Sequence, residues 1–110
     1  MQIRREVAFG AAGTNLNVLA GLSVEFVKDD SIVTLAATSV SLAIRLTMRF
    51  TDEVVLDDAT TRIVAAGVGP ILPDDILVGR AFANAGEHLL LSAIATGIST
   101  LTYLLDVSPV

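Results

Sequence analysis

The chain has 110 residues, no cysteine and a formal net charge of −5, and 53% of its residues are apolar against 17% charged. This length suits one domain over residues 1–110, the missing cysteines exclude disulfides and thiolate metal sites, and the negative charge argues against nucleic acid as a partner. Average soluble domains carry about a quarter charged residues, so the apolar excess, with a mean hydropathy of +0.71, indicates surface that another subunit or a membrane covers.

The first forty residues alternate short extended segments with turns. Residues 3–9 are predicted to form a strand that ends in a glycine-rich loop, and the glycines and polar residues that follow break the apolar run of a signal peptide, so we expect no secretion signal. Residues 22–26 alternate again and stop at Lys28-Asp29-Asp30, a turn signal. Residues 32–37 begin with β-branched side chains, and we expect them to pair with the strand that comes next.

That next strand, at residues 40–50, has the clearest pattern in the chain. Apolar and polar side chains alternate without a fault, as in a strand whose successive side chains point to opposite faces. A helix would scatter the apolar ones around its whole circumference. The apolar set is Val40, Leu42, Ile44, Leu46, Met48 and Phe50.

The middle of the chain continues with short strands and turns. Strands are predicted at 53–56 and 61–65 on either side of a turn at Asp57-Asp58. Residues 67–73 hold two prolines and two glycines, which predict a loop. A further strand is predicted at 76–82, and a turn follows at 84–87.

Residues 88–105 carry no formal charge and allow more than one structure. β-Branched residues at every second position from Ile94 to Thr102 favour strands, and Gly97 suits the turn of a hairpin. A buried or interfacial helix and a membrane span are the alternatives. The serine, threonine and glycine residues make the segment too polar for a typical span, so a membrane contact is not favoured.

Together these segments predict an all-β domain. About eight short strands at spacings near ten residues, with turn residues between them, are typical of a β-sandwich, a jelly roll or a small barrel. We expect a single β-sandwich with a jelly-roll-like arrangement.

Catalytic chemistry has little to build on in this sequence. His88 is the single histidine, and Glu87 or Asp106 is the neighbour expected to orient it if it acts as a general base. No nucleophile motif accompanies it, so a hydrogen-bonded histidine at the end of a strand is favoured. We expect no enzyme and no cofactor, and one histidine without cysteine excludes an ordinary zinc site.

Three Asp-Asp pairs recur beside the predicted strands, at 29–30, 57–58 and 74–75. Carboxylates gathered at one end of a sandwich would suit Ca²⁺, which takes six to eight oxygen ligands. Aspartate also favours turns, because its side chain accepts hydrogen bonds from nearby backbone amides. Solvated turns are the favoured interpretation, and a calcium-binding or other ligand-binding module stays as an alternative.

A possible subunit interface comes from the polar side of the strand at 40–50. Arg45 and Arg49 lie four residues apart, about 13 Å along a strand, and arginine is favoured at interfaces because it pairs with carboxylates through two hydrogen bonds. We expect this arginine face to meet the aspartates of a neighbouring copy, with a solvated face as the equal alternative. The aspartates of that hypothesis are Asp57, Asp58, Asp74 and Asp75.

Several stretches give the chain a resemblance to the small β-rich virion proteins of bacteriophages, namely capsid, decoration or spike-base subunits. They are the run FTDEVVL at 50–56, the loop GPILPDD at 69–75, AGEHLLL at 85–91 and the ending LDVSPV at 105–110. The resemblance implies a structural subunit of a virion, in the cytoplasm of an infected host, that buries apolar surface against its own copies and other virion proteins. A membrane-associated protein that uses residues 88–105 is the remaining alternative.

Overall fold

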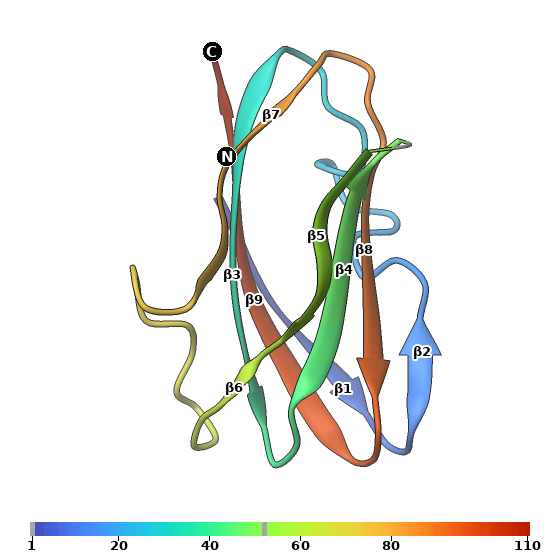
Figure 1. Cartoon of the computed structure of the whole chain (residues 1–110), viewed down its shortest axis with the longest axis vertical. Coiled ribbons are helices and arrows are strands. Elements are labelled where there is room, and N and C mark those ends of the chain that lie inside the picture. Colours follow the sequence, from blue (N-terminus) through green and yellow to red (C-terminus); the bar gives the residue numbers. More distant parts are fainter. Residues whose placement is uncertain (1, 52) are drawn as a thin grey trace.

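The computed structural model describes residues 2–51 and 53–110, and this part of the chain forms nine β-strands in two sheets that pack face to face (Figure 1). The strands are β1 (Gln2–Phe9), β2 (Gly13–Asn15), β3 (Ser31–Val40), β4 (Ile44–Phe50), β5 (Glu53–Thr60), β6 (Arg62–Ile63), β7 (Ile76–Ala83), β8 (Leu89–Ala95) and β9 (Ser99–Pro109). The predicted all-β sandwich is confirmed.

The order of the strands is that of a jelly roll. The first sheet runs β1-β9-β3, with β7 and the short β6 both paired to the far edge of β3, and the second runs β2-β8-β4-β5. These pairs are antiparallel except for the parallel pair of β3 and β6. With β6 set aside, each sheet interleaves early and late strands of the chain, as in a double-sheet jelly roll.

Within β4, the apolar residues of the alternating pattern are buried in the core, as predicted. Leu46 and Met48 are fully buried between the sheets, and Arg45 and Arg49 are exposed on the opposite side. The predicted strand is nevertheless too long, because Val40 ends β3 and residues 41–43 form a turn. The chain changes sheets at this turn, where Ser41 has a φ of 79°, and one continuous strand cannot do so.

Two predicted strand pairings are wrong, because in both cases the chain passes from one sheet to the other between the two strands. β3 does not pair with β4, since it lies between β9 and β7 in the first sheet. Residues 89–95 and 99–109 are strands with a turn at 96–98, as favoured over a helix, but they form no hairpin, because β8 pairs with β2 and β4 while β9 pairs with β1 and β3. Among the described residues, the structure has no helix with the length and apolarity needed to cross a membrane.

The strand predicted at residues 22–26 is absent. This segment belongs to an irregular connection at 16–30 that carries the chain from β2 in one sheet to β3 in the other. Asn17 fixes its start, because its side-chain oxygen accepts hydrogen bonds from the backbone N–H groups of Leu19 and Leu91, each at 3.1 Å. The Tyr103 hydroxyl reaches through the core from β9 and donates to the Val18 carbonyl at 3.1 Å.

Tyr103 provides a spectroscopic test of this connection, because it is the only tyrosine in the chain. Burial raises its pKa above the ordinary value of 10.0. The neutral hydroxyl therefore stabilises the folded protein below pH 10, and this stabilisation is lost as the pH rises toward the folded-state pKa. We expect the phenolate absorbance of the folded protein to appear later in an alkaline titration than that of the urea-unfolded chain. Coincident titrations would contradict the burial of Tyr103.

The expected turn at Asp57-Asp58 is also wrong, because β5 runs through both residues. The register of β4 and β5 shifts between Leu46 and Met48, opposite this pair, so the strand contains a bulge. Asp58 has a φ of 53°, a left-handed conformation that aspartate tolerates better than most residues. The residues predicted as a strand at 61–65 keep only the two-residue β6.

The predicted loop at 67–73 is confirmed and covers part of the first sheet. Ala36, Thr38 and Thr102 lie on the outer side of that sheet and are buried. The guanidinium of Arg4 lies against Gly69, where an added Cβ atom would come within 2.5 Å of it. β7 and the turn at 84–87, in which Gly86 has a φ of 89°, are confirmed as predicted.

Candidate interaction surface

The outer face of the second sheet carries Arg45 and Arg49, two of the residues predicted for an interface. Opposed residues of antiparallel neighbours point to the same side of a sheet, so the register of β8, β4 and β5 defines the face. Leu90, Arg49 and Val54 form one row across it, and Ile94, Arg45 and Thr60 form another. We call this surface the open face, and its residues are Arg45, Thr47, Arg49, Val54, Thr60, Leu90, Ser92 and Ile94.

The open face exposes aliphatic side chains that a small domain would usually bury. Val54 is 50% exposed, Ile94 is 38% exposed, and Leu90 is half-buried. The outer face of the first sheet differs, because the loop at 64–75 lies over its centre. A second flat surface could pack on the open face without displacing any part of the fold.

Arg45 and Asp58, two of the residues predicted for an interface, pair within the chain. The Arg45 Nε atom donates a hydrogen bond to Asp58 Oδ1 at 2.7 Å, and a second guanidinium N–H donates to Oδ2. The Asp58 backbone N–H also donates to Thr47 Oγ1 at 3.2 Å, which holds the bulge of β5 against β4. The hydrogen bonds from Arg45 keep the pKa of Asp58 below its usual range.

Arg49 has a different setting on the same face. It is exposed on β4, and its neighbours across the sheet are Leu90 of β8 and Val54 of β5. Asp57 is exposed on the neighbouring β5. Two of the six residues predicted for a subunit interface, Arg45 and Arg49, thus belong to the open face, and Asp58 joins them through its pair with Arg45.

Asp74 and Asp75 lie elsewhere, in the loop over the first sheet. The Asp75 side chain is only 2% exposed and accepts hydrogen bonds from Arg62 Nε at 2.8 Å, Arg62 Nη2 at 2.9 Å and the Ile71 backbone N–H at 2.8 Å. The Arg62 hydrogen bonds lower the pKa of Asp75. The Asp75 carboxylate is thus paired within its own chain, whereas its neighbour Asp74 is exposed. Nothing in the local sequence pattern pointed to Arg62 as the partner.

The single histidine is hydrogen-bonded at the start of a strand, as the sequence favoured. His88 forms an isolated β-bridge with Phe26 just before β8, and the two rings stack with centroids 4.4 Å apart. Its Nε2 lies 2.7 Å from Glu25 Oε2. The backbone N–H of Gly21 and the hydrogen bond to His88 lower the pKa of Glu25. The expected partners Glu87 and Asp106 are wrong, and Glu87 instead accepts a hydrogen bond from Asn84.

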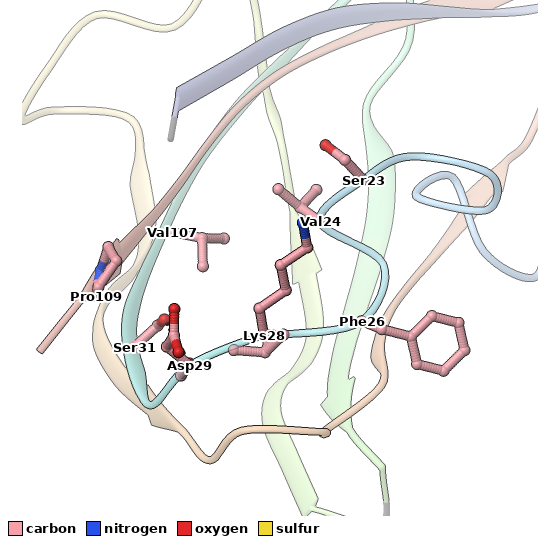
Figure 2. A pocket seen from close by; sticks show the side chains of 9 residues that line it. Ser23, Val24, Phe26, Lys28, Asp29, Ser31, Val107 and Pro109 are labelled. Carbon is pink, nitrogen blue, oxygen red and sulfur yellow. Dashed lines mark hydrogen bonds between the residues drawn. The ribbon is translucent and has the colours of Figure 1, made fainter.

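A small pocket lies beside the connection at 16–30 and near the end of β9. It has a volume of about 170 Å³ and is lined by Val24, Lys28 and Val107 among others, while the ring of Phe26 points away from them (Figure 2). Pockets for small organic ligands usually hold about 300–1,000 Å³. The space suits a side chain or a few water molecules better than a cofactor.

The Asp29-Asp30 pair beside this pocket stabilises a turn, as predicted for a solvated aspartate pair. Asp30 Oδ1 accepts a hydrogen bond from the Ala85 backbone N–H at 2.8 Å, and the Asp29 carbonyl accepts one from the Ser31 hydroxyl at 2.8 Å. Within residues 2–51 and 53–110 there is no group of three or more histidine, cysteine, aspartate or glutamate residues placed to hold a metal ion.

The open face therefore combines arginine with aliphatic side chains. Arg49 lies between Leu90 and Val54, Arg45 lies between Ile94 and Thr60, and lysine and glutamate do not occur among its residues. Comparison with family models, with curated proteins and with solved structures finds no match for this chain.

Proposed function

We propose that the protein is a non-enzymatic structural subunit, a capsid or other virion-associated protein of a bacteriophage, whose copies associate through the open face. The observation that carries the proposal is the exposed aliphatic surface of Val54, Leu90 and Ile94 around Arg49. It lies on hydrogen-bonded strands of the second sheet, so the backbone that carries it is in place before any partner binds.

The overall composition supports the same proposal. A domain of 110 residues with 17% charged side chains leaves more apolar surface than it can bury alone. The jelly roll occurs in viral capsid proteins and also in lectins and cupins. A fold by itself does not determine a function, so the open face, rather than the topology, carries the proposal.

The two arginines of the open face have separate roles in the proposed contact. Arg45 is already paired with Asp58, so this pair enters an interface with its charges matched. Arg49 requires a carboxylate from the neighbouring copy, because an unpaired buried charge costs several kcal/mol. Asp57, which is exposed on β5 of the same sheet, is the aspartate of the interface hypothesis that a second copy can offer to it.

Lysine substitutions on the open face test the proposal. We expect Val54→Lys or Ile94→Lys to weaken self-association about 100-fold, because each places an unpaired charge in the contact. Both positions are exposed in the single chain, so the fold should persist. Sedimentation equilibrium measures the dissociation constant, and circular dichroism checks the fold.

Ile63→Lys is the matched control, because Ile63 is 53% exposed on β6 of the other sheet. It introduces the same charge away from the open face and should leave the dissociation constant unchanged. If the open-face variants associate as strongly as the wild-type protein, the open face is not the contact.

A further inference from the structure

We propose that a second copy of this chain also adds to the first sheet at β1, edge to edge and antiparallel, so that one sheet continues across two subunits. The inference rests on the proposed function in that it names a second contact of the same assembly. β1 forms one edge of the first sheet, and within residues 2–51 and 53–110 its single strand neighbour is β9. Such an edge presents unpaired backbone N–H and C=O groups to any strand that approaches.

The other edges of the sandwich are short or bulged, and β1 is neither. Among the described residues, β2 and β6 have only three and two residues, and β5 and β7 each show two register shifts against their neighbours. Short strands and bulges are the usual means by which proteins block edge-to-edge pairing. β1 instead pairs with β9 in unbroken register over eight residues, Gln2 to Phe9, and contains neither glycine nor proline.

Symmetry limits the possible registers of such a pair. Two identical antiparallel strands that continue one sheet are related by a two-fold axis perpendicular to it, so residues that face each other point to the same side of the sheet. Glu6 and Arg4 lie on the outer side of β1, opposite Thr102 and Leu104 of β9. Ile3 and Val7 lie on the inner side and pack against the core.

One register brings complementary side chains together on both sides. When the two-fold axis passes through Arg5, Arg4 of each copy faces Glu6 of the other, and Ile3 faces Val7. Opposite charges and aliphatic pairs directly across two strands are both favourable. A shift of the axis to Arg4 or to Glu6 places two like charges opposite each other and leaves no opposite-charge pair.

Arg5 sets the strength of the contact in this register. It lies on the inner side opposite Tyr103, so the two copies of Arg5 face each other at the axis. Like charges directly across two strands oppose pairing, and a charge on the inner side of an edge strand limits uncontrolled growth of a sheet. The β1 contact is therefore a reversible dimer contact.

Charge exchange between Arg4 and Glu6 tests the proposal in the Ile94→Lys variant, in which the open-face contact is weakened. That variant should still form dimers, which sedimentation equilibrium measures. Adding Arg4→Glu or Glu6→Arg creates two like-charge pairs and should weaken the dimer about tenfold or more. Adding both restores two opposite-charge pairs and should return the dissociation constant to its starting value. Arg5→Thr removes the two like charges that face each other at the axis and should lower the dissociation constant of the dimer.

The double exchange also controls for the contact of Arg4 with Gly69, because Arg4 is lost in both the single and the double variant. A double variant as weak as Arg4→Glu alone, or single variants that dimerise normally, would overturn the β1 contact and leave the open face standing. A monomeric Ile94→Lys protein would also overturn it. A wild-type protein that never associates would overturn both contacts.

Discussion

Leu46→Ala is expected to lower the free energy of unfolding by about 3–5 kcal/mol. Leu46 is fully buried on β4, between Ala93 of β8 and Ala59 of β5, and its side chain belongs to the core between the two sheets. Its truncation removes buried apolar surface and leaves a cavity that close-packed neighbours fill only in part. Small domains have about 5–15 kcal/mol of total stability, so urea denaturation of the variant should show a large loss.

Leu42→Ala is the matched comparison, because Leu42 and Leu46 belong to the same alternating apolar series in the sequence. The structure places Leu42 in the turn at 41–43, where it is 40% exposed and contacts Gly97. Its truncation should cost about 1 kcal/mol or less, since little apolar area is buried there. Equal losses at the two positions would contradict the change of sheet after Val40.

Asp75→Ala is expected to lower the free energy of unfolding by about 2–4 kcal/mol. The substitution removes the acceptor of two Arg62 hydrogen bonds and leaves the Ile71 N–H without its side-chain partner. Arg62 is half-exposed and can turn toward water, so the loss should stay below that of a fully buried ion pair. Asp74→Ala removes the same carboxylate from the exposed neighbouring position and should change the stability by less than about 0.5 kcal/mol.

The effect of Asp75 should also depend on pH in a defined direction. The pKa of Asp75 is lower in the folded protein than its ordinary value of 3.8. Its stabilisation is therefore present above pH 3.8 and is lost as the pH falls through the folded-state pKa. Thermal melts of the wild type and of Asp75→Ala should differ most near neutral pH and converge in acid. A difference that grows in acid would contradict the ion pair with Arg62.

The sequence was most informative where burial alternates along a strand. At β4 each buried residue is followed by one on the outer side, and hydrophobic pattern alone predicted both the strand and its two faces. β1 and β7 were also predicted nearly to their ends. The pattern also favoured strands over a helix at residues 88–105, because β-branched residues recur at every second place.

The hydrophobic pattern did not reveal where the chain passes from one sheet to the other. The alternation continues through Leu42 although the chain turns there, since nothing in the local pattern records which sheet a residue belongs to. An Asp-Asp pair is typical of turns and also occurs in bulges, so the sequence pattern predicts a turn where the structure has a bulge at Asp58. Residues 22–26 have strand-like alternation, but hydrogen bonds accepted by the Asn17 side chain and donated by Tyr103 hold the connection at 16–30 in another conformation.

The candidate surface was predictable in part. Arg45 and Arg49 were correctly placed on one polar face of β4, because their spacing is that of a strand. Val54, Leu90 and Ile94 were missed as their neighbours, since only the pairing of three strands brings them together. Asp75 could not be recognised as buried, because its partner Arg62 is thirteen residues away in the sequence.

The most direct test of the assembly is the molar mass of the wild-type protein by multi-angle light scattering over a wide concentration range. The open face and the β1 edge together predict a mass that rises with concentration to multiples of the 11.5 kDa chain. A mass that stays at 11.5 kDa up to the highest concentration would contradict the proposal that copies of this protein form a structural assembly.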